Sequence, residues 1–195
     1  MTTIPGQLSR SRFYAMEEFF GARTTVAGVI FVACNGRDRI WHQNADLVAN
    51  ELPRFDMETL IERNRREELA NFREVCDRII QKYFIAPRES CPKWLLVVVN
   101  KLDLYWNYRK SAADFYRPGS GSPFDNVAQE LLTRLGTTSL SYFTLPVAAE
   151  PANFNFDSSR GHLERASKLS YGQCSESMAC LMETLGELCE QSARR

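Results

Sequence analysis

The sequence predicts an α/β fold, a three-layer sandwich around a mostly parallel sheet. Two long apolar runs, residues 24–34 and 94–99, lack the alternation of a half-exposed strand, and such runs are typical of strands buried on both faces. Segments of helical periodicity alternate with the strands, which favours right-handed crossovers between parallel strands. With 195 residues, of which 44% are hydrophobic and 25% charged, we expect one domain spanning residues 1–195.

The expected order is helix, strand, helix, strand, helix, strand, helix. The first strand stops at Asn35-Gly36 and the second at the polar pair Asn100-Lys101. A third, weaker strand is predicted over residues 139–147, ended by Pro151. Because ligands of open α/β sheets sit beyond the carboxyl ends of the strands, the site is expected after residues 34, 99 and 147.

Four helices are expected, over residues 9–20, 57–84, 124–135 and 169–192. The longest carries apolar residues mainly at three- and four-residue spacings; Asp56 can cap its start and Pro87 bars its continuation. Gly136 stops the third helix. The last helix carries an apolar stripe typical of a core face, formed by Met178, Leu181, Met182, Leu185 and Leu188. Residues 117–123 and 151–163 are expected to be exposed loops.

The composition of the chain argues against several classes of function. With 24 basic and 24 acidic side chains, net charge gives no argument for a nucleic-acid partner. No stretch approaches the ~20 apolar residues of a membrane span, and the first residues do not resemble a signal peptide. Six cysteines without CxxC spacing and only two histidines argue against zinc. We therefore expect a cytoplasmic protein with reduced, mostly buried thiols and no metal site.

The strongest motif is Asn100-Lys101-Leu102-Asp103, directly after the second buried strand. It resembles the NKxD motif of the P-loop GTPases, in the position where that superfamily carries it. The resemblance implies that Asp103 accepts parallel hydrogen bonds from N1–H and the exocyclic amine of guanine, a pair that adenine cannot offer. Asn100 would bond the purine edge, and the stem of Lys101 would lie along the base. The alternative is a chance four-residue match, which we consider the weaker interpretation.

Two further segments resemble GTPase motifs. Thr3-Ile4-Pro5-Gly6-Gln7 is similar to the DxxGQ segment, which implies that Gly6 approaches the γ-phosphate and Gln7 positions the attacking water. Thr3 replaces the aspartate, and its neutral hydroxyl is a weaker Mg²⁺ partner, which argues against metal-assisted hydrolysis. Taken alone, Pro5-Gly6 is better explained as a simple turn after a strand.

The loop after the third strand offers the third match. Residues 146–150 occupy the place of the S-A-x loop, which makes Ala148 and Ala149 the candidates for the backbone amide that contacts the guanine oxygen. Residues 36–39 and the aromatic residues Tyr105, Trp106 and Tyr108 flank the expected mouth of the site. They are open to two interpretations, partner binding and loop packing, of which packing is favoured.

No GxxxxGK[ST] segment occurs in the 195 residues. The resemblance therefore implies an N-terminally incomplete GTPase fold of bacterial or Ras-like type, missing the first strands and the phosphate-binding loop. We expect a GTP- or GDP-binding domain with negligible hydrolysis on its own, completed by a protein partner or by the missing N-terminal segment. Two alternatives stay open: a non-catalytic pseudo-GTPase that binds a protein, and an unrelated flavodoxin-like α/β domain.

Overall fold

The computed structural model describes residues 16–38, 45–136 and 138–193 of the chain. Residues 16–20 are helical, at the end of the helix expected over residues 9–20, whose earlier part lies outside the described residues. The longer elements follow in the order β1 (Gly28–Ala33), α2 (Ala45–Glu51), α3 (Met57–Ile85), β2 (Trp94–Val99), α4 (Arg109–Tyr116), α5 (Pro123–Leu135), β3 (Ser141–Pro146), β4 (Phe154–Ser158), β5 (Gly161–Arg165) and α6 (Tyr171–Ala193). Short 3₁₀ turns cover Arg88–Ser90, Leu102–Leu104 and Trp106–Tyr108.

The central sheet has three strands in the order β1-β2-β3, all parallel, which confirms the α/β class. Gly28 of β1 lies beside Trp94 of β2, which in turn lies beside Ser141 of β3. A Cβ on Gly28 would come within 2.0 Å of the Trp94 ring, so this position in the strand requires glycine. The strand β2 is buried along its whole length, as its unbroken apolar run indicates.

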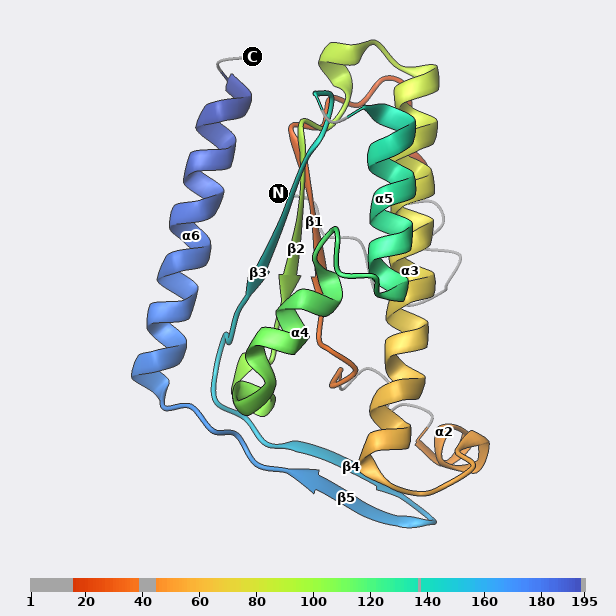
Figure 1. Cartoon of the computed structure of the whole chain (residues 1–195), viewed down its shortest axis with the longest axis vertical. Helices are drawn as coiled ribbons and strands as arrows, with labels where there is room; N and C mark the ends of the chain where they lie inside the picture. Colours follow the sequence, from red (N-terminus) through yellow and green to blue (C-terminus); the bar gives the residue numbers. More distant parts are fainter. Residues whose placement is uncertain (1–15, 39–44, 137, 194–195) are drawn as a thin grey trace.

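Helices cover both faces of the sheet and give the molecule three layers (Figure 1). The helices α3 and α5 lie on one face, where Phe72 stacks on Phe124 at 4.6 Å between ring centroids. The helix α6 lies alone on the other face, packed on Trp94, Leu96 and Val98 of β2. Successive side chains of β2 therefore alternate between two hydrophobic cores, one on each face of the sheet.

The two helices of the first face begin at side-chain caps. Asp56 accepts a hydrogen bond from the amide of Thr59 at 2.8 Å, and α3 ends before Pro87, as expected. Ser122 caps α5 by accepting from the amide of Asp125, with Pro123 at the first helical position.

Two expectations for the second half of the chain were wrong in detail. Residues 151–163 do not form a loop, because β4 and β5 pair there as an antiparallel hairpin. The cause is a short alternation: Phe154 and Phe156 are buried against α2 and α3, while the residues between and after them are exposed. In the stripe of α6, Met182 is 64% exposed instead of packed. The helices α2 and α4 had not been expected.

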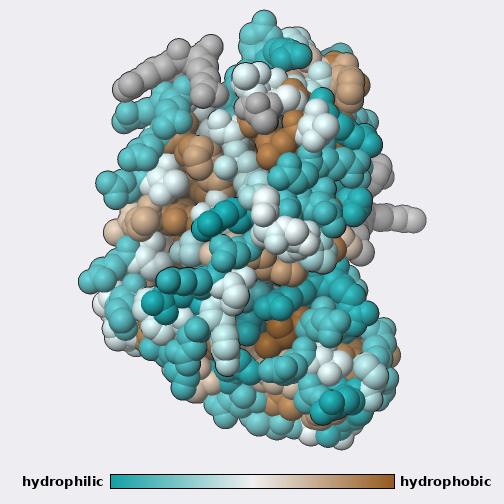
Figure 2. Space-filling view, in the orientation of Figure 1, coloured by the Kyte–Doolittle hydropathy of each residue, from teal (hydrophilic) through white to brown (hydrophobic). Residues whose placement is uncertain are grey.

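Figure 2 shows apolar surface in separate patches, some of them beside α6 and around the hairpin, on an otherwise mostly hydrophilic face. Within the described ranges, no helix is long and apolar enough to cross a membrane.

Candidate functional site

The carboxyl ends of the three parallel strands bring three loops together. The amide of Asn100, after β2, donates to the carbonyl of Ala33 at the end of β1 (2.7 Å). The amide of Leu102 donates to the carbonyl of Val147, after β3 (3.0 Å). The loops that were expected to form the site are thus joined directly by backbone hydrogen bonds, at the edge where open parallel sheets hold ligands.

The Asn100–Asp103 segment makes a tight turn at this edge. Lys101 adopts a left-handed backbone conformation (φ 63°), and its amide donates to the side-chain oxygen of Asn100 at 2.8 Å. Both side chains are partly exposed. The turn carries the chain into a short 3₁₀ helix, which buries the next candidate, Asp103.

Asp103 is fully buried. Its Oδ2 accepts from the amide of Ala152 at 3.3 Å, and its backbone carbonyl accepts from the amide of Lys168 at 2.9 Å. Its Oδ1 has no hydrogen-bond partner within the described part of the chain. A buried carboxylate oxygen without a donor is unfavourable by about 1–3 kcal/mol or more, and so it marks a place where a donor is missing.

The two candidate residues after β3, Ala148 and Ala149, differ in burial. Ala148 is buried, and its amide donates to the Oγ of Ser177 in α6 at 3.0 Å. Ala149 is exposed. Asn100, Lys101, Asp103 and Ala148 therefore lie on adjoining loops, whereas Gly6 and Gln7 lie outside the described residues.

A buried network fixes the loop after β1, and sequence reasoning did not find it. Glu68 of α3 accepts from the amides of Cys34 (2.9 Å) and Gly36 (3.0 Å) through Oε1, and from the hydroxyl of Tyr116 (2.9 Å) through Oε2. Burial raises the pKa of Glu68, while these three hydrogen bonds act in the opposite direction. Asn64, one turn earlier, donates to the carbonyl of Gly36. The only feature of the sequence that could have indicated this network is the acidic residue Glu68 at a buried position of α3.

The same loop buries Arg37, which is 4% exposed. Its Nη1 donates to the carbonyl of Asn35, and its guanidinium lies 5.5 Å from the ring centroid of Tyr105. Tyr105, also buried, donates its hydroxyl to the carbonyl of Val99. These contacts agree with the expectation that Arg37 and Tyr105 take part in loop packing.

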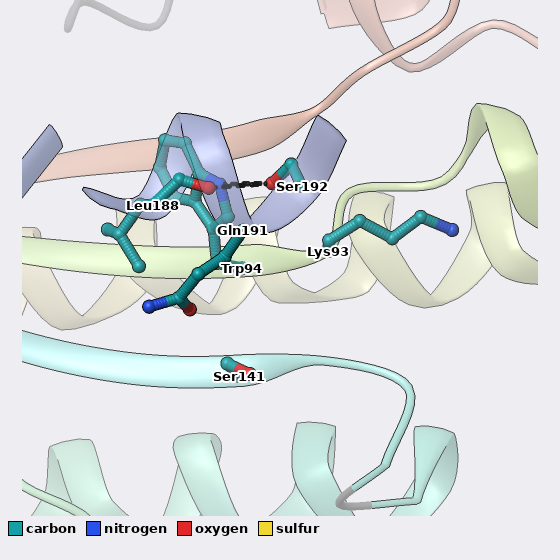
Figure 3. Close-up of a pocket in the computed structure, with 6 residues that line it drawn as sticks. All are labelled: Lys93, Trp94, Ser141, Leu188, Gln191 and Ser192. Atoms are coloured by element: carbon teal, nitrogen blue, oxygen red, sulfur yellow. Dashed lines mark hydrogen bonds between the residues drawn. The ribbon is translucent and has the colours of Figure 1, made fainter. Parts of the chain in front are cut away.

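Hollows in the surface lie at the opposite edge of the sheet. Figure 3 shows one at the amino ends of β2 and β3, where Trp94 donates from Nε1 to the Oγ of Ser192 at 3.0 Å. It has room for about one water molecule. A second hollow lies nearby, between Tyr83, Arg88 and Thr138. Neither contains an unpartnered buried charge, so the carboxyl edge remains the better candidate site.

Comparisons of the chain with protein-family models, with curated proteins and with solved structures found no match.

Proposed function

We propose that the carboxyl edge of the sheet recognises a guanine base and that the chain is a guanine-nucleotide-binding, GTPase-like domain. The observation that carries the proposal is the buried Asp103, whose Oδ1 has no donor among the described residues. Guanine offers N1–H and the exocyclic amine side by side, and a carboxylate accepts both in parallel.

The surrounding groups suit the rest of a purine. The amide of Ala148 is one loop away and is a donor for the guanine O6, in exchange for its hydrogen bond to Ser177. The partly exposed stem of Lys101 offers an apolar surface for the base plane. Asp103 has no exposed surface, so base binding requires the connector around Ala152 to move and release Oδ2 from its 3.3 Å hydrogen bond.

Affinity for the base alone is expected to be low. At about −0.3 kcal/mol per non-hydrogen atom, guanosine gains roughly −6 kcal/mol, a Kd of about 0.05 mM at best. The sequence contains no GxxxxGK[ST] segment to cradle phosphates, so we expect negligible GTP hydrolysis by these 195 residues alone.

A change of base preference tests the proposal. In Asp103→Asn the side chain presents one acceptor and one donor, which matches the N1–H and C2 carbonyl of xanthine instead of guanine. Calorimetry with guanosine, xanthosine and adenosine should show at least a tenfold loss of guanosine affinity and a gain for xanthosine, since a hydrogen bond to a charged group contributes about 1.5–3 kcal/mol.

Asp114→Asn is the matched control, because this exposed side chain of α4 undergoes the same chemical change away from the edge. It should leave all three affinities unchanged. Equal binding of guanosine and adenosine by the wild type, or an unaltered order of preference in Asp103→Asn, would refute guanine recognition.

A further inference from the structure

Arg37 and Arg65 both donate to Asn35, in the loop after β1: Arg37 to its carbonyl and Arg65 to its Oδ1. Arg37 follows β1, Arg65 lies in α3 and Arg165 ends β5. The positive charges of Arg165 and Arg65 both lower the pKa of Arg37, after the larger effect of burial. Arg165 is about 130 positions from Arg37 in the sequence, yet its charge acts on Arg37.

Arg37 has no acidic partner. Among the described residues no carboxylate forms an ion pair with it, and its Nε has no hydrogen-bond acceptor although the side chain is 4% exposed. The buried carboxylate of this loop, Glu68, is already occupied by the amides of Cys34 and Gly36 and the hydroxyl of Tyr116. Within the described ranges, the guanidinium makes one polar contact, a hydrogen bond from Nη1 to the carbonyl of Asn35.

Such an arrangement is unfavourable without an anion. Burial, followed by the charges of Arg165 and Arg65, lowers the pKa of Arg37 to about 10, so the group still carries its charge at neutral pH. A buried charge without a partner is strongly disfavoured, and a like charge beside it makes it more so. Arg65 is itself held in place, since its Nε donates to Asn35 Oδ1 at 2.8 Å and its guanidinium lies over the Phe115 ring.

We propose that Arg37 and Arg65 form an oxyanion site that binds a phosphoryl group, with Arg165 as an additional positive charge. The Nε of Arg37 is the directed donor, and the half-buried Arg65 and Arg165 supply charge; because this Nε is buried, binding requires the loop after β1 to open. The planar donor fork of a guanidinium matches the oxygen spacing of phosphate. This site does not depend on guanine recognition, although Tyr105, which supports Arg37, lies two residues beyond Asp103.

Phosphate binding by the intact chain tests the site. Inorganic phosphate at ten times its Kd should raise the Tm of the wild type by roughly 3–5 °C, with sodium chloride at equal ionic strength as the salt control. Arg37→Gln should abolish the rise without lowering the Tm in phosphate-free buffer, because it removes an uncompensated buried cation. Arg165→Gln should weaken phosphate binding several-fold. Arg54→Gln, at an exposed arginine, should leave the phosphate-dependent rise unchanged.

Binding of GMP and guanosine shows whether the phosphoryl group belongs to a nucleotide or to a separate ligand. It also distinguishes the oxyanion site from guanine recognition. If GMP binds tighter than both guanosine and phosphate, and Arg37→Gln removes the gain, the phosphoryl group is that of the nucleotide. If GMP binds no tighter than phosphate, the site serves a separate phosphorylated ligand. Asp103→Asn should retain phosphate binding, so that failure of guanine recognition leaves this result intact. No phosphate-dependent rise in the wild type, or an equal rise in Arg37→Gln, overturns the oxyanion site.

Discussion

Replacing Glu68 by alanine should be among the most damaging single changes to the candidate site. The carboxylate takes three hydrogen bonds from groups that the fold buries: the amides of Cys34 and Gly36 and the hydroxyl of Tyr116. Alanine leaves all three donors without an acceptor. It also releases the loop that carries Arg37 from α3.

The magnitude follows from counting these donors. Each buried donor without an acceptor is unfavourable by about 1–3 kcal/mol, and water that enters the vacated space recovers part of this. We therefore expect Glu68→Ala to lower the free energy of unfolding by about 3–5 kcal/mol, a large share of the 5–15 kcal/mol typical of a domain.

Glu68→Gln separates hydrogen bonding from charge. Its carbonyl oxygen can accept from both amides and its NH₂ can donate to the Tyr116 oxygen, so the loss at pH 7 should stay below about 1.5 kcal/mol. Burial raises the pKa of Glu68 above its ordinary value of 4.5, so between the two values the folded protein holds more protons than the unfolded chain. Wild-type stability should therefore fall as pH rises through that window, and Glu68→Gln should lack this contribution.

Urea unfolding followed by circular dichroism, at several pH values from 4.5 upward, measures both effects. Glu62→Ala, an exposed position in the same helix, is the control and should change stability by no more than about 0.5 kcal/mol. If Glu68→Ala is destabilised by less than about 1 kcal/mol, or Glu68→Gln as much as Glu68→Ala, the network does not hold the loop as argued.

Two further predictions concern other parts of the molecule. In calorimetry, Gly28→Val should lower stability by about 1–3 kcal/mol, because its Cβ would meet the Trp94 ring at 2.0 Å. Gly186→Ala in α6, with open space around it, should raise stability by about 0.5–1 kcal/mol. Equal effects of the two substitutions would refute the close approach of Gly28 to Trp94. The hydrogen bond with Asp157 raises the pKa of His162 above 6.5. The protonated His162 therefore contributes to folding stability; this contribution is complete below pH 6.5 and is lost as pH rises through the pKa of the folded state. Titration by NMR should show this pKa returning toward 6.5 in Asp157→Asn, and an unchanged value would rule out the pairing.

The parallel sheet could be predicted because its cause is local. An apolar run such as Trp94–Val99 needs cover on both faces, and α3 and α6 provide it. The hairpin was missed because its signal is only two buried residues, Phe154 and Phe156, between polar neighbours that also suit a loop. A pattern so short gives no clear period.

The candidate site was predictable only in part. The place of Asp103 at the end of β2 follows from the sequence, because a strand ends where the polar residues begin. Its burial under the connector at Ala152 does not, since that contact depends on how the hairpin folds back. The contacts of Glu68 with Cys34 and Gly36 join positions more than 30 residues apart, and no local pattern indicates them. Guanine recognition remains a prediction.

The unequal cover of the sheet has a consequence for synthesis of the chain. The face of β2 formed by Trp94, Leu96 and Val98 is covered by α6, which begins about 70 residues after β2 ends. At a translation rate of about 5–20 residues per second, that apolar face is complete roughly 4–14 s before synthesis of its helix begins. During this interval the nascent chain exposes an apolar surface, which a chaperone could bind until α6 covers it.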